Sequence, residues 1–163
     1  MSQHISFLKK ALWVMYLDVV TQAGVPHSRI VSEVTESYLL YENLTINGNL
    51  NVHQTHGFKL SIDDFGSGMS AVTSLFRLPL YQVKLDRSLI NEAIRLDAYM
   101  KLITYLCNFG RGRNIALVAE GVETTDMFDK LVKISVTYQG YCLCRPSEPQ
   151  VWLENRKVRS SKN

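Results

Sequence analysis

Acidic residues stand at the ends of several apolar segments that we expect to be strands. These residues are Glu33, Glu36, Asp63, Asp64, Asp86, Glu120 and Glu123. In a barrel of alternating strands and helices, the active site is built at the carboxyl ends of the strands. Carboxylates are also the ligands that hard divalent cations such as Mg²⁺ and Mn²⁺ prefer. The pattern therefore predicts a metal-dependent site assembled from several strand ends.

The elements that would position these side chains alternate along the chain. The apolar patterns predict strands over 29–35, 58–64, 81–86, 115–120 and 136–144, and helices over 7–23, 37–42, 71–77, 88–109 and 125–133. Residues 43–56 are rich in Asn and Gly, and we expect a long loop or a frayed helix there. Alternating strands and helices predict an α/β fold with a parallel sheet covered by helices. Because no GxGxxG motif marks a Rossmann-like sheet, a TIM-type barrel is favoured.

Five short segments occur in the order of one family's signature motifs. They are Glu33-Val-Thr-Glu-Ser37, Asp63-Asp-Phe-Gly-Ser-Gly68, Lys84-Leu-Asp-Arg87, Ala119-Glu-Gly-Val-Glu-Thr124, and Gln139-Gly-Tyr141 with Arg145-Pro146. In these motifs the chain resembles the EAL domain, the family of magnesium-dependent cyclic di-GMP phosphodiesterases, from about Gly24 to Pro146. One motif alone would be a weak signal. Five in order, each at the end of a predicted strand, form a specific one.

The resemblance implies a two-metal site for Mg²⁺ or Mn²⁺. Glu33 and Asp63 would hold the first ion and Asp64 the second. Glu120 would be a ligand or the base that takes a proton from the attacking water, and Lys84 would lie beside that water and the phosphate. The reaction implied is hydrolysis of cyclic di-GMP to linear pGpG, which paired metal ions promote by neutralising the phosphate and ionising water.

The resemblance also implies a group of residues that bind the substrate or support the site. They are Glu36, Glu123, Gln139, Gly66, Ser67 and Gly68. Glu36 would anchor the glycine-flanked loop 65–70, which in the family places metal and substrate and takes part in dimerisation, so a homodimer is a possible assembly. Gly66 and Gly68 supply backbone freedom in that loop. Glu123 would support the metal site, and Gln139 would contact the nucleotide.

The sequence departs from the family pattern near its start. The Glu-Ala-Leu triplet that names the family, and whose glutamate is a metal ligand, occurs nowhere in the chain. The nearest counterpart of a second ligand strand is His4-Ile5-Ser6, and its imidazole nitrogen would be a poor ligand for a hard ion. A full barrel takes about 250 residues. We therefore expect an incomplete barrel of about five strands over 1–148, followed by a basic tail over 149–163.

Composition fits a single globular domain. The 163 residues are 46% hydrophobic and 20% charged, with a net charge of +3, which argues against disorder and gives no reason to expect a nucleic-acid polymer as partner. Cys107, Cys142 and Cys144 have no regular spacing, which favours a reducing compartment, and the last two are expected on one strand face. No apolar run reaches the roughly 18 residues of a membrane span, and no secretion signal is recognisable. These features predict a cytoplasmic protein with no membrane segment.

Several interpretations remain open. Any single acidic residue could instead cap a helix or pair with a basic side chain, and His53 and His56 fit a surface loop better than a metal site. Since two family metal ligands are missing, we expect the isolated chain to be a weak or inactive phosphodiesterase. The alternative is an inactive remnant that acts as a nucleotide- or protein-binding regulatory module. A gene fragment without function is the third possibility.

Overall fold

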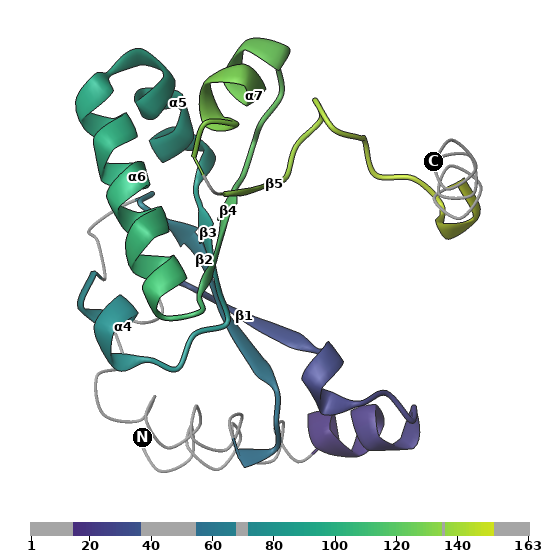
Figure 1. Cartoon of the computed structure of the whole chain (residues 1–163). Coiled ribbons are helices and arrows are strands. Elements are labelled where there is room, and N and C mark those ends of the chain that lie inside the picture. Colours follow the sequence, from purple (N-terminus) through teal and green to yellow (C-terminus); the bar gives the residue numbers. More distant parts are fainter. Residues whose placement is uncertain (1–14, 37–54, 68–71, 135, 152–163) are drawn as a thin grey trace, which may run out of the picture.

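The computed structural model describes residues 15–36, 55–67, 72–134 and 136–151 (Figure 1). After a helix at 15–22, the elements are η1 (His27–Arg29), β1 (Val31–Thr35), β2 (Lys59–Phe65), α4 (Val72–Arg77), β3 (Gln82–Leu85), α5 (Arg87–Arg95), α6 (Asp97–Gly112), β4 (Ala116–Ala119), α7 (Thr125–Leu131) and β5 (Thr137–Tyr138). The five strands form one parallel sheet in the order β1-β2-β3-β4-β5. Helices α4, α5 and α6 lie along one side of this sheet (Figure 1). The predicted α/β class and the number of strands are confirmed.

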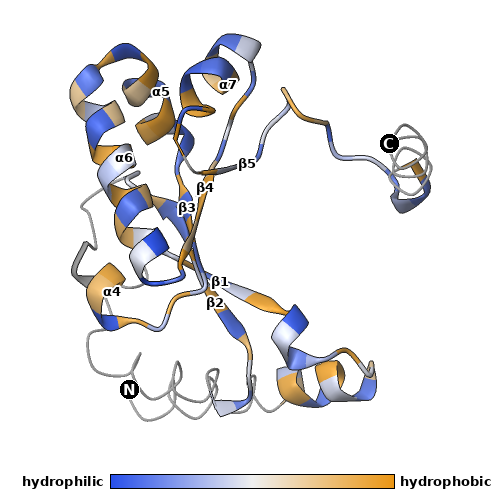
Figure 2. Ribbon diagram, viewed as in Figure 1, coloured by the Kyte–Doolittle hydropathy of each residue, from blue (hydrophilic) through white to orange (hydrophobic). Residues whose placement is uncertain are grey.

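The hydrophobic core lies between the central strands and the helices. Ile62 of β2 and Leu85 of β3 are fully buried, and they share one cluster with Ile90 of α5, Ile103 of α6 and Leu131 of α7. Burial of an aliphatic side chain of this size stabilises the fold by about 2 kcal/mol. Hydrophobic and polar residues alternate along α5 and α6 (Figure 2), because each helix buries only one face. The core fixes the three central strands firmly against the helices.

The parallel strands bring their carboxyl ends to one edge of the sheet. Thr35 pairs with Asp63 across β1 and β2, and Leu85 pairs with Ala119 across β3 and β4. Residues just beyond these pairs therefore meet at the same end. Within the described residues the sheet does not close, because β1 and β5 each have one strand neighbour. This open sheet agrees with the expected incomplete barrel.

The single helix predicted over 88–109 is wrong, because two helices occupy this range. Leu96 has an extended backbone, with φ −126° and ψ 119°, and separates α5 from α6. Asp97 then begins α6. The break lets each helix place its own apolar face on the core, with Ala93 buried on α5 and Ile103 buried on α6. No glycine or proline marks this position, so the sequence pattern predicted one continuous helix.

The strand predicted over 136–144 is also too long. β5 covers only Thr137–Tyr138, and the chain then turns, with the N–H of Leu143 donating to the carbonyl of Gly140 at 3.1 Å. The expectation that Cys142 and Cys144 share a strand face is therefore wrong. Cys142 packs half-buried against the core cluster, whereas Cys144 is exposed.

Some expectations fall on residues whose structure is not described. They concern His4, the helix over 37–42, most of the loop over 43–56, Gly68, and most of the tail over 149–163. His56 is described and is exposed, as expected for a surface loop. In the described parts of the chain, no helix combines the length and apolar character needed to cross a bilayer.

Thiol reactivity should reveal the packing of α6. Burial raises the pKa of the Cys107 thiol from 9.0 to about 11, although nearby Arg111 acts in the opposite direction. We expect a thiol reagent at pH 8 to label the exposed Cys144 rapidly and Cys107 only after unfolding. Since the folded state retains this proton between pH 9 and 11 while an unfolded chain releases it, stability should fall as pH rises through that range. Labelling followed by peptide mass spectrometry checks that Cys144 reacts before Cys107. Rapid labelling of Cys107 in the native protein would contradict this prediction.

Candidate active site

Lys84 lies among three carboxylates from different strands. Its Nζ atom is 2.8 Å from Glu120 Oε1, 3.0 Å from Asp63 Oδ1 and 3.3 Å from Glu33 Oε1. The strands β1, β2, β3 and the end of β4 each contribute one of these four residues. The acidic side chains that the sequence placed at separate strand ends thus converge on one ammonium group.

The position of Lys84 keeps it protonated. Its side chain is only 10% exposed, and this desolvation alone would lower the lysine pKa. Contacts with Glu120 and Asp63, together with their negative charges, outweigh that effect and raise the pKa above its ordinary value of 10.5. Lys84 therefore carries a positive charge among these carboxylates at physiological pH.

A second set of three carboxylates, which shares Asp63 and Glu120 with the first, is arranged as a candidate cation site. One oxygen each from Asp63, Asp64 and Glu120 lie within 4.8 Å of one another. Asp63 Oδ1 is buried and accepts no well-aligned hydrogen bond from the described residues, although Lys84 Nζ is close. An all-oxygen, partly buried set of this kind fits a hard divalent ion. Glu33 contacts Lys84, but its carboxylate is not one of the three in this set.

A backbone irregularity explains how two adjacent aspartates serve one site. Side chains of consecutive strand residues normally point to opposite faces. Here the register between β2 and β3 shifts between Ile62 and Phe65, and Asp64 has a positive φ of 55°. Such an irregularity re-aims side chains, and it brings Asp63 and Asp64 to the same group of ligand atoms.

The loop after β2 is held by Glu36. The Gly66 N–H donates a 2.9 Å hydrogen bond to Glu36 Oε2, and the Ser67 N–H donates to the Asp64 carbonyl at 3.1 Å. Glu36 is 2% exposed, so this carboxylate contact is formed away from bulk water. Gly66 has φ 91°, a conformation that other residues rarely adopt. The anchoring contact that the resemblance implied for Glu36 is present.

Replacing Glu36 should loosen this loop. We expect Glu36→Ala to remove the acceptor for Gly66 and to speed amide exchange at residues 66 and 67, because a lost bond to a charged group costs about 1.5–3 kcal/mol. Glu36→Gln is the matched control, since it keeps an oxygen acceptor at the same length. Hydrogen exchange read by mass spectrometry measures the effect. Wild-type exchange at residues 66 and 67 in Glu36→Ala would show that the carboxylate does not hold the loop.

Asp86 follows the simpler interpretation of a strand-end acid. Its Oδ1 accepts hydrogen bonds from the N–H and the hydroxyl of Ser88, so it caps α5. Among the described acidic groups it is not part of the cation set. Capping fixes the start of α5, which carries Arg87 beside the site.

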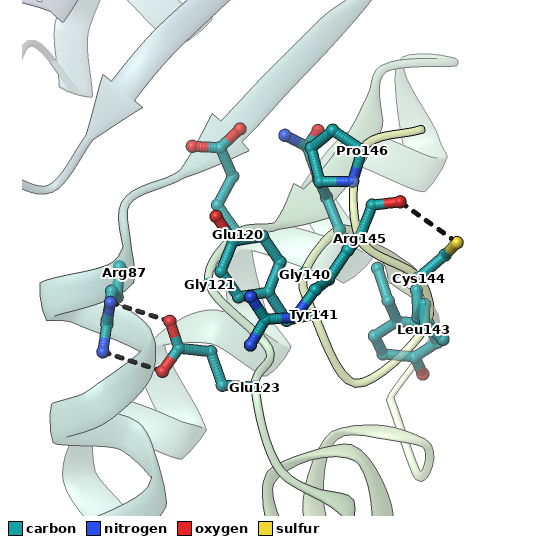
Figure 3. Close-up of a pocket in the computed structure, with 12 residues that line it drawn as sticks. Arg87, Glu120, Gly121, Glu123, Gly140, Tyr141, Leu143, Cys144, Arg145 and Pro146 are labelled. Carbon is teal, nitrogen blue, oxygen red and sulfur yellow. Dashed lines mark hydrogen bonds and ion pairs between the residues drawn. The ribbon is translucent and has the colours of Figure 1, made fainter. Parts of the chain in front are cut away.

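A cavity of about 590 Å³ lies beside Glu120. Figure 3 shows the side chains that line it. Glu123 and Gln139 line the same cavity as Glu120. Gln139 is held in place by its backbone, whose N–H donates to the Ala119 carbonyl at 2.9 Å. Arg87 also lines the cavity and forms an ion pair with Glu123. No pattern along the chain marks Arg87 as the partner of Glu123, because the two residues lie 36 positions apart.

The pattern of the EAL domain family matches residues 4–146. The chain belongs to the EAL domain family. The match includes every motif that carried the resemblance, and it begins at His4 of the segment compared with the second ligand strand.

Relatives of this EAL domain include larger signalling proteins. The chain is 32% identical over 130 residues to the oxygen sensor protein DosP of Escherichia coli, which covers 79% of this chain and 16% of DosP. It is 34% identical over 135 residues to the bifunctional diguanylate cyclase/cyclic di-GMP phosphodiesterase MucR of Pseudomonas aeruginosa, covering 80% of this chain and 20% of MucR. The chain thus spans about a fifth or less of these two relatives.

Solved structures of EAL domains share the fold. The MucR phosphodiesterase in complex with cyclic di-GMP has a TM-score of 0.73 and 31% identity, with 83% of this chain and 55% of that chain covered. BlrP1 of Klebsiella pneumoniae, solved with manganese and cyclic di-GMP, has a TM-score of 0.75 and 28% identity over 83% of this chain and 34% of its own. The described sheet is therefore part of the EAL-type barrel.

Proposed function

We propose that this EAL domain hydrolyses cyclic di-GMP to linear pGpG in a reaction that depends on Mg²⁺ or Mn²⁺. The observation that carries the proposal is the convergence of Glu33, Asp63 and Glu120 on Lys84, with Asp64 beside them. MucR and BlrP1, solved with cyclic di-GMP, support the choice of substrate.

Glu33, Asp63, Asp64 and Glu120 would hold the metal ions. Bound there, divalent ions would polarise the phosphodiester and acidify a water molecule. The chain's own residues supply the remaining steps. Glu120 takes a proton from the attacking water, and the Lys84 ammonium offsets negative charge that builds on the phosphate oxygens.

The cavity beside Glu120 offers room for the nucleotide. Its volume of about 590 Å³ is in the range of small-ligand sites. The Gln139 side chain supplies hydrogen-bond donors and an acceptor for a base or ribose, and Arg145 adds positive charge toward an anionic ligand. Gly66, Ser67 and Gly68 would help to place the substrate, as the family resemblance implies.

The remaining expectations complete the proposal. The EAL domain would occupy residues 1–148, with a basic tail over 149–163, and would act in the cytoplasm. A homodimer would form next to the loop 65–70, which Glu36 anchors at Gly66.

A turnover assay tests the proposed function. The full chain is incubated with cyclic di-GMP and Mn²⁺ or Mg²⁺, and the products are separated by ion-pair chromatography. We expect pGpG to form slowly, because the Glu-Ala-Leu triplet is missing from the sequence. Hydrolysis should stop when EDTA is added, and activity should return with excess metal. No pGpG with either metal would contradict the enzymatic proposal.

A regulatory binding module is the second candidate. It is favoured by the open edges at β1 and β5 in the described sheet and by the absence of a Glu-Ala-Leu triplet in the sequence. Titration calorimetry with cyclic di-GMP separates the two functions. Binding without turnover would support the module, whereas binding with turnover would support the enzyme.

A further inference from the structure

We infer that Arg87 is a positioning residue that holds the turn carrying Glu120. This inference deepens the proposed function and rests on the role proposed there for Glu120. Arg87 is the first residue of α5, whereas Glu120 follows β4, so the two belong to different parts of the chain.

Arg87 contacts Glu123, at the end of the turn that Glu120 begins, through a bidentate ion pair. Its Nη1 lies 2.8 Å from Glu123 Oε1, and its Nη2 donates to Glu123 Oε2 at 3.0 Å. Paired contacts of this kind fix orientation as well as distance, because the planar guanidinium matches the carboxylate. In Figure 3 the Glu120 side chain leads away from the Arg87–Glu123 pair. Arg87 therefore acts on Glu120 through the turn and not by touching it.

The aliphatic part of Arg87 also packs directly on the residue after Glu120. A Cβ atom added to Gly121 would lie 2.6 Å from Arg87 Cγ and 2.8 Å from its Cβ. Gly121 has φ 66°, so glycine suits both the conformation and the close approach. Arg87 thus contacts the turn at residue 121 through its stem and at residue 123 through its head group.

The opposite side of the turn is fixed by the segment after β5. The Val122 N–H donates to the Gln139 carbonyl at 3.1 Å, and the Cys142 N–H donates to the Val122 carbonyl at 3.0 Å. A Cβ atom on Gly140 would lie 2.2 Å from the Val122 oxygen, so these backbones are in close contact. The turn is therefore held on one side by the Arg87 side chain and on the other side by backbone hydrogen bonds from the segment after β5.

This arrangement separates positioning from stability. The side chains of Arg87 and Glu123 are 57% and 36% exposed, and exposed ion pairs contribute little to folding. A catalytic group displaced by about 1 Å can nevertheless lose roughly 100-fold in rate. Loss of Arg87 should therefore damage the site far more than the fold.

The test compares Arg87→Gln with Arg95→Gln, which removes an exposed Arg–Glu pair on the same helix. Three quantities are measured on the full chain: thermal midpoint, Mn²⁺ affinity by electron paramagnetic resonance, and kcat and KM with cyclic di-GMP. Partners that orient metal ligands typically contribute 10–100-fold. We expect Arg87→Gln to lower Mn²⁺ affinity and kcat by about that factor, with little change in KM or thermal midpoint. Arg95→Gln should match the wild type.

Three further variants test whether the pair acts as a unit: Arg87→Lys, Glu123→Gln, and the double variant of Arg87→Gln with Glu123→Gln. Arg87→Lys keeps the charge but not the fork and should recover only part of the loss. In the double variant Arg87→Gln, Glu123→Gln, the loss should be no larger than the greater single loss, because coupled partners are not additive.

The outcomes distinguish this inference from the proposed function. A wild-type chain that binds Mn²⁺ without turnover, with weaker binding in Arg87→Gln, would reject the enzyme and support the positioning role. Wild-type Mn²⁺ affinity and rate in Arg87→Gln would overturn the inference. So would additive losses in the double variant, a fall in thermal midpoint that accounts for the lost activity, or a wild-type chain that binds no Mn²⁺.

Discussion

Replacement of Glu120 by glutamine is expected to lower kcat for cyclic di-GMP hydrolysis by about 1,000-fold, within the 10²–10⁴ range of general-base catalysis. Glutamine has the same shape but cannot accept the proton of the attacking water. It also removes a negative charge 2.8 Å from Lys84 Nζ. Single-turnover kinetics with saturating Mn²⁺ would measure the chemical step without interference from product release.

The metal affinity of Glu120→Gln separates two roles for this carboxylate. A large fall in Mn²⁺ affinity together with kcat would identify a ligand, because Glu120 shares the candidate cation set with Asp63 and Asp64. Unchanged affinity with reduced kcat would identify a base. Glu92→Gln is the control, since this half-exposed residue pairs with Arg95 on α5, away from the cation set. A wild-type rate in Glu120→Gln would remove Glu120 from the mechanism.

Replacement of Lys84 by methionine is expected to affect both turnover and stability. The rate should fall by roughly 100- to 1,000-fold, as when one charge-stabilising donor is removed. Without the ammonium, Glu33, Asp63 and Glu120 face one another uncompensated. Breaking such a mostly buried arrangement costs about 3 kcal/mol. Urea unfolding of the metal-free variant would measure this loss.

Divalent cations should restore much of the stability that Lys84→Met loses. A bound cation supplies positive charge next to the same carboxylates, so Mn²⁺ should raise the unfolding midpoint of the variant more than that of the wild type. Lys101→Met is the matched control, because Lys101 pairs with Asp97 in full solvent on α6. An unchanged midpoint in metal-free Lys84→Met would show that the ammonium does not hold the carboxylates together.

Local sequence patterns were sufficient for β1 to β4 and for the end of the sheet at which the acidic residues lie, although they made β5 too long. Short apolar runs bounded by turn residues define β2, β3 and β4, because these strands are buried on both sides. A parallel sheet then places Glu33, Asp63 and Glu120 at one edge wherever the chain runs in between. Local patterns did not predict the break at Leu96 between α5 and α6. This break is set by core packing, and no residue type marks it.

The composition of the site was thus determined by the sequence, and its geometry by the tertiary structure. The residue types and their order predicted a metal-dependent EAL site with Lys84 among acids. Only the folded chain decided that Asp63 and Asp64 both reach it, since that depends on a register shift against β3. The same is true of the pairing of Arg87 with Glu123, whose partners meet only after β3 and β4 align. Periodicity is a property of neighbours along the chain, whereas these contacts are set by elements that become neighbours only on folding.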